Sequence, residues 1–202
     1  MKKLFVAATA GATGLAFGAT DPSGFIYLQA SDGKDEQSFG SGLHWPEGAA
    51  PEAGNSYYVP SGLELKTTSG SAAATFAGDV LAVSGTLTSQ KGGQGRITVN
   101  DLRLLDGSLF TFNGISEFNG TLTVEGTTTI KPPWPDGANW IYFLGNLAGD
   151  EHATFTFGRT TRYSAYPKAP MPDCPVRMSG SLSDFYGTLL LPNWTAGAVM
   201  TA

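Results

Sequence analysis

The 202-residue sequence has one cysteine, Cys174, so an intramolecular disulfide is excluded. Histidine is nearly as scarce, with only His44 and His152, which excludes a site built from several imidazoles. Charged residues make up 14% of the chain, and the formal net charge is −5. Because nucleic acid and anionic membranes bind basic faces, neither is an expected partner.

The sequence also lacks a sustained apolar period of 3.6 residues after residue 20, so almost no helix is expected. It contains 27 glycines, many serines and threonines, and short runs of leucine, valine and isoleucine. Short apolar runs separated by glycine-containing turns are typical of an all-β chain.

Residues 1–19 have the pattern of an export signal. Lys2 and Lys3 precede an uncharged segment rich in alanine, glycine, leucine and phenylalanine. This segment is too short and too rich in glycine for a comfortable membrane span. We therefore expect a signal peptide, an exported protein and no membrane-spanning segment in the mature chain; the alternative is an ordinary apolar N-terminus.

The stretch 117–126 predicts a β-strand, because apolar and polar residues alternate along it. Its pattern, Phe-x-Gly followed by Leu-x-Val or Leu-x-Leu, occurs three times, starting at Phe76, Phe118 and Phe185. Both gaps between these starts are close to multiples of about 21–22 residues, a period that indicates a solenoid.

Two architectures fit short strands joined by glycine turns: a single-stranded parallel β-helix and an antiparallel β-sandwich or jelly roll. The repeat favours the β-helix, because equivalent side chains must then stack coil upon coil. We expect residues 57–202 to form the β-helix, with Phe118, Leu122 and Val124 facing its interior.

Residues 20–56 precede the regular repeats and contain two large apolar anchors, Phe39 and Trp45. An open first coil exposes apolar side chains and unpaired backbone groups, so we interpret this segment as an N-terminal cap. The last residues, 197–202, carry no charge or proline that would end a solenoid. We therefore expect the chain to be truncated here, or to pair end to end with a partner.

Several segments share a loose pattern of glycine, aromatic and aliphatic positions: Ser38-Phe39, His44-Trp45, Gly54, Tyr57–Val59, Thr75–Gly78, Arg96–Leu102 and Phe118–Val124. In this pattern residues 38–191 resemble the autotransporter-associated β-strand repeat proteins, which are large exported bacterial proteins. The resemblance implies a right-handed parallel β-helix of the passenger type, displayed at the cell surface or released from it. It implies no catalytic residues and no cofactor.

The residues themselves also give no sign of catalysis. The densest polar cluster is Asp150-Glu151-His152, but adjacent strand residues point to opposite faces, and the preceding Gly149 indicates a solvated turn. His44 and His152 lie far apart in the sequence and lack cysteine or histidine neighbours at ligand spacing, so no metal site is expected. We predict that the protein is not an enzyme.

Two proline-rich stretches, 131–137 and 166–175, interrupt the repeat, because prolines cannot donate ladder hydrogen bonds. Aromatic residues lie in or beside them, and their planar rings are candidates for stacking on sugars. The predicted glycan contacts are Trp134, Trp140, Tyr163 and Tyr166. The alternative is that these rings dock the loops onto the side of the solenoid.

These observations predict a non-catalytic, exported β-helix with a structural or adhesive role, presenting a long, weakly acidic surface rich in serine and threonine. Its expected partners are extracellular polysaccharides or ligands on cell surfaces, and its expected location is the cell surface or the extracellular space, with the periplasm as an alternative. The second hypothesis is a secreted β-helix that binds or cleaves polysaccharide. Two carboxylates in a cleft beside Trp134 or Trp140 would favour that hypothesis.

Overall fold

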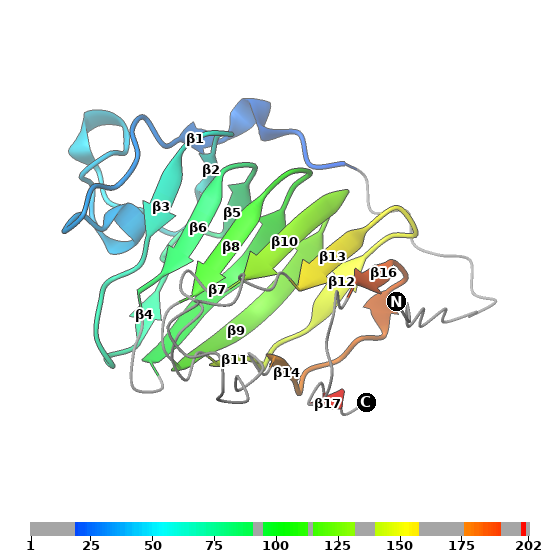
Figure 1. The fold of residues 1–202 in the computed structure, drawn as a ribbon. Coiled ribbons are helices and arrows are strands. Elements are labelled where there is room, and N and C mark those ends of the chain that lie inside the picture. Colours follow the sequence, from blue (N-terminus) through cyan, green and yellow to red (C-terminus); the bar gives the residue numbers. More distant parts are fainter. Residues whose placement is uncertain are drawn as a thin grey trace, which may run out of the picture.

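The chain folds as a right-handed parallel β-helix, or β-solenoid (Figure 1). A computed structural model describes residues 19–90, 95–112, 115–131, 140–157, 176–190 and 199–200. The strand pairs of both sheets run parallel throughout the described residues. The predicted all-β parallel β-helix is therefore confirmed, and the antiparallel sandwich is wrong.

The strands form two sheets. The main path of the eleven-stranded sheet is β1 (Ile26–Tyr27), β2 (Ser56–Val59), β5 (Val80–Val83), β7 (Gly95–Leu104), β9 (Ile115–Val124), β11 (Trp140–Phe143), β14 (Val176–Met178) and β17 (Val199–Met200). Beside this path lie β4 (Ala74–Thr75), β12 (Leu147–Gly149) and β15 (Asp184–Phe185). The six-stranded sheet is β3 (Glu64–Lys66), β6 (Thr86–Ser89), β8 (Leu109–Phe112), β10 (Thr127–Lys131), β13 (Thr154–Phe157) and β16 (Thr188–Leu190).

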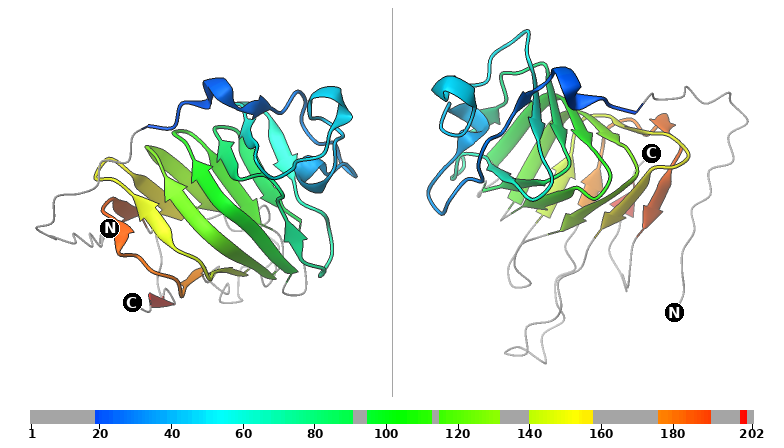
Figure 2. Two further views of the ribbon diagram at one scale, coloured as in Figure 1. Left: turned by 180° about the vertical axis from the view of Figure 1, so that it is seen from behind. Right: turned by 90° about the horizontal axis from the view of Figure 1, so that it is seen from above.

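Helix is confined to three short 3₁₀ turns in the described part of the chain: η1 (Pro22–Gly24), η2 (Ser38–Gly40) and η3 (Pro46–Gly48). Among the described residues, no helix has the length and apolar character needed to cross a membrane. The two sheets face each other across the core (Figure 2).

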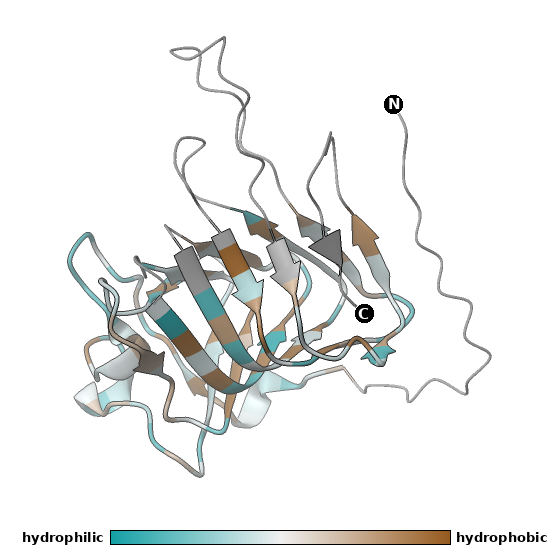
Figure 3. Cartoon of the chain, turned by 90° about the horizontal axis from the view of Figure 1, so that it is seen from below, coloured by the Kyte–Doolittle hydropathy of each residue, from teal (hydrophilic) through white to brown (hydrophobic). Residues whose placement is uncertain are grey.

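The core consists of columns of apolar side chains stacked in register. One column contains Tyr57, Leu81, Leu102, Leu122 and Leu147, which pair in sequence from coil to coil. All five are at most 2% exposed. Hydrophobic and hydrophilic residues alternate along the strands, as expected for one buried face (Figure 3).

Phe118, Leu122 and Val124 are each 1% exposed, which confirms that they face the interior. Opposite them, the six-stranded sheet contributes inward side chains such as Leu87, Phe110 and Ile130, which also stack in register. Burial of these columns from both sheets supplies the main stabilising free energy of the coil.

The strand register gives the number of residues in each coil. Residues of the column from Tyr57 to Leu147 pair with their equivalents one coil later, and each step spans about 20–25 residues, within the range of solenoid repeats. The next coil is longer, because Ala148 pairs with Asp184. The predicted repeat of about 21–22 residues therefore describes the central coils and fails where a longer connection is inserted.

The sequence repeat starting at Phe185 is not structurally equivalent to the repeat starting at Phe118. Phe185 lies beside Gly149, and Leu189 pairs with Phe155 in the six-stranded sheet. The predicted third copy is therefore wrong, because its leucines belong to the other sheet.

Glycine marks a corner of the coil more reliably than the Phe-x-Gly pattern does. Gly120, Gly145 and Gly180 stack where the chain turns within the larger sheet. A Cβ atom on Gly145 would overlap the carbonyl oxygen of Gly120, and one on Gly180 would overlap that of Gly145. Gly120 also has φ +121° and approaches the carbonyl of Val99, so only glycine fits at this position.

The N-terminal segment, residues 19–55, packs on the solenoid. β1 pairs with β2, so the larger sheet already begins within the segment interpreted as a cap. Phe39 lies 5.2 Å from Phe76 between ring centroids, and Trp45 packs edge-on against Tyr57 at 5.0 Å. Phe39 and Trp45 are 1% and 2% exposed, so these aromatic side chains extend the core beyond the first regular coil.

The start of this segment runs along the solenoid across several coils (Figures 1 and 2). The Thr20 backbone N–H donates to Glu125 Oε2 at 2.7 Å, and Arg103 Nη1 donates to Thr20 Oγ1 at 3.0 Å. Arg103 also donates twice to Asp101 Oδ2, and these hydrogen bonds raise the pKa of Arg103 above its ordinary value. These contacts join the segment to coils far from it in sequence.

We expect Gly120→Ala to destabilise the fold by about 3 kcal/mol or more, because the new Cβ meets a backbone carbonyl in a left-handed conformation. Urea denaturation measures this change. The control is Gly24→Ala, since a Cβ at Gly24 meets no atom within 4 Å. A loss below about 1 kcal/mol at Gly120 would contradict the stacked corner.

We expect a substitution at Thr128 to stabilise the fold, because the buried Thr128 hydroxyl has no protein hydrogen-bond partner. Thr128→Val keeps the shape of the side chain and removes an unpaired polar atom, so we expect a gain of about 1 kcal/mol in unfolding free energy. Thr129→Val is the matched control on the outer face, with a change within about 0.5 kcal/mol. Equal effects at both positions would show that Thr128 does not face an apolar interior.

Candidate functional site

Of the four predicted glycan contacts, only Trp140 lies among the described residues, where it begins β11 and pairs with Ile115. Trp134, Tyr163 and Tyr166 lie outside the described residues, together with most of both proline-rich stretches. The predicted sugar contacts therefore stay a prediction.

The cluster Asp150-Glu151-His152 forms a turn between β12 and β13, as the sequence indicates. Asp150 Oδ1 accepts the backbone N–H of His152 at 2.9 Å and that of Ala153 at 3.1 Å. The side chains of Glu151 and His152 are 82% and 81% exposed. The acid at the head of the cluster closes the turn, and its neighbours point into solvent.

The most regular surface is the outer side of the six-stranded sheet, which we call the threonine face. Inward residues such as Leu87 and Phe155 are fully buried, so their strand neighbours point outward. Eight of these outward residues are threonines: Thr86, Thr88, Thr111, Thr127, Thr129, Thr154, Thr156 and Thr188. Thr127 is exposed, Thr111 is buried at 8% exposure, and the other six are half-buried.

The threonines form a two-dimensional array, because the strands pair in register. Across the strands, Thr88 pairs with Thr111, Thr127 with Thr154 and then Thr188, and Thr129 with Thr156. Along the strands, the Thr-x-Thr pattern occurs at 86–88, 127–129 and 154–156. Neighbouring threonines are therefore about 4.8 Å apart across the sheet and about 6.6 Å apart along a strand.

One neighbouring pair of hydroxyl groups on this face is joined by a hydrogen bond. Thr88 and Thr111 share a hydrogen bond of 2.7 Å between their Oγ1 atoms, and Thr88 Oγ1 donates to Glu64 Oε1. Threonine is restricted at χ1 by its branched Cβ. The array is therefore largely ordered before any ligand arrives.

Charge is confined to the margins of the threonine face. Glu64 and Lys66 lie on β3 at one end of the sheet, and Lys131 ends β10. The outward residues of β6, β8, β13 and β16 are threonine or leucine, with Leu109 and Leu190 occupying two positions of the array. The described outward positions of this sheet include no aromatic residue.

A polar cluster in the N-terminal segment was missed by the sequence analysis. Asp32, Glu36 and His44 each place one potential ligand atom within 4.8 Å of the others. His44 Nε2 lies 2.9 Å from Glu36 Oε2 and 3.9 Å from Asp32 Oδ1. The spacing of these three residues in the sequence matches no common metal motif, so no pattern pointed to them.

The hydrogen bonds of Asp32, Glu36 and His44 indicate that these residues hold the N-terminal segment against β3 and do not form a metal site. We call this cluster the clamp. Buried Asp32 accepts the Ser38 N–H and hydroxyl, and the Lys66 backbone N–H at 2.7 Å. Lys66 Nζ donates to the carbonyl oxygens of Asp32 and Gly33 at 2.9 and 2.8 Å. A carboxylate with its lone pairs engaged, next to an ammonium group, opposes a second cation.

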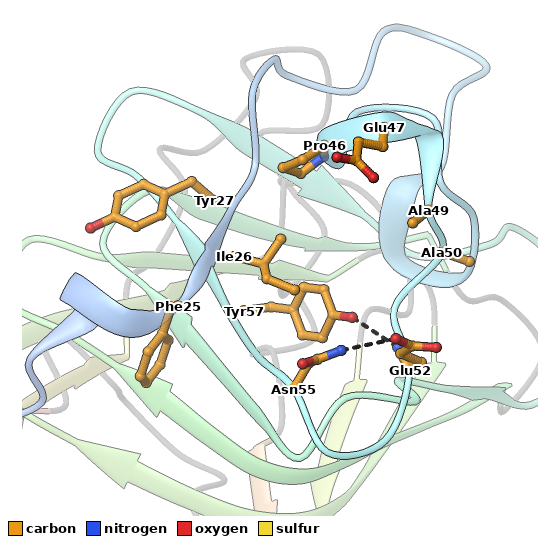
Figure 4. Close-up of a pocket in the computed structure, with 10 residues that line it drawn as sticks. All are labelled: Phe25, Ile26, Tyr27, Pro46, Glu47, Ala49, Ala50, Glu52, Asn55 and Tyr57. Atoms are coloured by element: carbon orange, nitrogen blue, oxygen red, sulfur yellow. Dashed lines mark hydrogen bonds between the residues drawn. The ribbon is translucent and has the colours of Figure 1, made fainter.

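A pocket of about 490 Å³ lies between the N-terminal segment and the first coil (Figure 4). Phe25 and Tyr57 contribute aromatic rings, and Glu47 and Glu52 contribute carboxylates, whereas the ring of Tyr27 points away from these residues. Glu47 has φ +59°, a conformation that non-glycine residues adopt rarely and often at binding sites. Rings beside carboxylates give this pocket the character of a small-ligand or sugar site.

The polar side of the pocket is held by two hydrogen bonds drawn in Figure 4. The Glu52 backbone N–H donates to Tyr57 Oη at 2.9 Å, and Asn55 Nδ2 donates to Glu52 Oε1 at 3.0 Å. These bonds fix the loop that carries Glu52 against the first coil.

Comparisons with known proteins identify no relative: no family model, curated protein or solved structure matches the chain. The resemblance to autotransporter-associated repeat proteins therefore stays a prediction. The threonine face and the N-terminal pocket are the two surfaces whose geometry bears on function.

The clamp predicts a pH dependence of stability. The hydrogen bond from His44, followed by that from the Gly33 N–H, lowers the pKa of Glu36 below its ordinary value of 4.5. The ionised Glu36 carboxylate therefore stabilises the folded state above pH 4.5, and this stabilisation is lost as the pH falls through the lower folded pKa of Glu36. We expect Glu36→Gln to be less stable than the wild type near neutral pH, and the difference to shrink as the pH falls below 4.5.

Thermal unfolding across this pH range measures the effect. Glu151→Gln is the control, because Glu151 is 82% exposed and lies away from the clamp. A stability difference between Glu36→Gln and wild type that stays constant down to the lowest pH would contradict the role assigned to the ionised Glu36.

Proposed function

We propose that the protein is an exported, non-catalytic β-solenoid with a structural or adhesive role at the cell surface or in the extracellular space, and that the threonine face is its contact surface. The observation that carries the proposal is the in-register array of eight threonines on one side of the six-stranded sheet. An export pattern in residues 1–19 supports the location.

A repeating surface suits adhesion to a repeating, uncharged solid. Each threonine offers one hydrogen-bond donor, two acceptor lone pairs and a methyl group, so one contact is weak. Many such contacts made together add to a high avidity, provided their geometry matches the target. The restricted side chains lose little conformational entropy on binding, which favours this mode further.

The N-terminal pocket supports a second candidate, binding of a carbohydrate. The ring of Phe25 and the carboxylates of Glu47 and Glu52 are groups that contact sugars by stacking and by accepting hydroxyl hydrogen bonds. In this alternative a soluble oligosaccharide competes for binding, and the threonine face plays no part.

The experiment measures partition of the purified chain, residues 20–202, onto crystalline cellulose, crystalline chitin and polycrystalline ice. We expect binding to at least one solid, and a loss of at least tenfold in Thr156→Glu, which places a charge in the array. Glu47→Ala, in the pocket, is the control and should bind as the wild type does.

Three outcomes decide between the candidates. Binding lost in Thr156→Glu and kept in Glu47→Ala supports adhesion through the threonine face. Binding lost only in Glu47→Ala favours the carbohydrate pocket and contradicts the role of the threonine face. Release of reducing ends from either polysaccharide would contradict a non-catalytic role.

A further inference from the structure

We infer that the solid recognised by the threonine face is ice; the inference rests on the proposed adhesive function and names its target. The spacing of the array supports this assignment. Threonines repeat at about 4.8 Å across the strands and about 6.6 Å along them. Water oxygens on the faces of hexagonal ice repeat at a distance close to the spacing across the strands, so waters bound along a row of the array can occupy positions of the crystal lattice.

Several neighbouring strands share the threonine pattern. Thr-x-Thr occurs on β6, β10 and β13, and single threonines on β8 and β16 continue the rows. The register places these strands side by side in the order β6, β8, β10, β13 and β16. The array therefore extends in two directions, which is what a crystal face requires and a single extended polymer does not.

The chemistry of the threonine side chain also suits ice. A threonine hydroxyl can replace a lattice water, because it both donates and accepts hydrogen bonds. The adjacent methyl group leaves neighbouring waters to bond with one another, so they order around it. Ice contains the same molecule as the solvent, so binding must come from many prearranged contacts, each of small net energy.

Charge and the absence of rings select ice over other solids. Minerals and charged polysaccharides call for opposite charges, but the described outward residues of β6, β8, β13 and β16 are uncharged. Crystalline neutral polysaccharides are commonly held by aromatic stacking, and the described outward positions of the six-stranded sheet hold no aromatic residue. A neutral lattice of hydrogen-bonding groups is the complementary partner.

The shape of the face also fits. In Figure 1 the strands β6, β8 and β10 lie nearly parallel to one another, and no described element lies in front of them. Regular side-chain ladders stabilise a sheet of low twist. The face can therefore meet a flat crystal over several strands at once.

Two departures from the array lead to a gain-of-function test. Leu109 occupies the row between Thr86 and Thr129, and Lys131 occupies the row beside Thr111. Leu109→Thr and Lys131→Thr each extend the array by one hydroxyl and one methyl group at the required spacing. We expect each change to increase ice-growth inhibition about twofold or more, because avidity grows with the number of matched contacts.

The test measures thermal hysteresis and inhibition of ice recrystallisation for the chain of residues 20–202. We expect faceted crystals and inhibited recrystallisation with the wild type, and at least a fivefold loss of activity in Thr129→Lys. Thr98→Lys is the matched control: Thr98 is a half-buried threonine on β7 of the larger sheet. Circular dichroism checks that both variants keep their fold.

The outcomes separate this inference from the proposed function. Ice growth unchanged by the wild type, or equal activity in Thr129→Lys and Thr98→Lys, overturns the inference. Binding to cellulose or chitin through the threonine face without activity on ice also overturns it, while the adhesive function stands. If the protein binds none of the three solids, both the inference and the proposed adhesive function are overturned.

Discussion

The fold depends on stacking equivalent side chains in register from one coil to the next. One buried column consists of Leu81, Leu102, Leu122 and Leu147. Each leucine pairs with the equivalent leucine of the adjacent coil. Since parallel strands lie about 4.8 Å apart, the column is continuous. The glycine corner keeps the backbones at this distance, because a side chain there would force neighbouring coils apart. The order of the outer face is a consequence of the same register.

The sequence was sufficient for the fold class and for part of the register. The alternation around Leu122 and its likeness to the segment at Leu81 placed both on one inner face, and the structure confirms it. The segment at Phe185 was misaligned because glycines occur at more than one kind of corner. The cluster of Asp32, Glu36 and His44 depends on how an irregular loop folds, which no periodicity describes.

The threonine face could be predicted from the sequence only in part, because its arrangement depends on the strand register. Each Thr-x-Thr pair is visible in the sequence, and so is the general abundance of threonine. Because successive coils differ in length, inspection of the sequence does not show that the pairs share one face. Pairing in the six-stranded sheet brings them together, with charge left at the margins. Adhesion and ice binding, as proposed, are therefore properties of the assembled sheet and of no single motif.

Disulfide trapping of the register tests this account most directly. In a chain with Cys174→Ser, the double variant Thr129→Cys and Thr156→Cys joins paired positions, whose Cα atoms lie about 4.8 Å apart, within disulfide range. The pair Thr127→Cys and Thr156→Cys is offset along the strand, and its Cα atoms lie about 8 Å apart, too far to be bridged. The account predicts rapid oxidation of the first pair and none of the second in the folded protein. Oxidation of the second pair, or equal oxidation of both, would contradict the register and the array built on it.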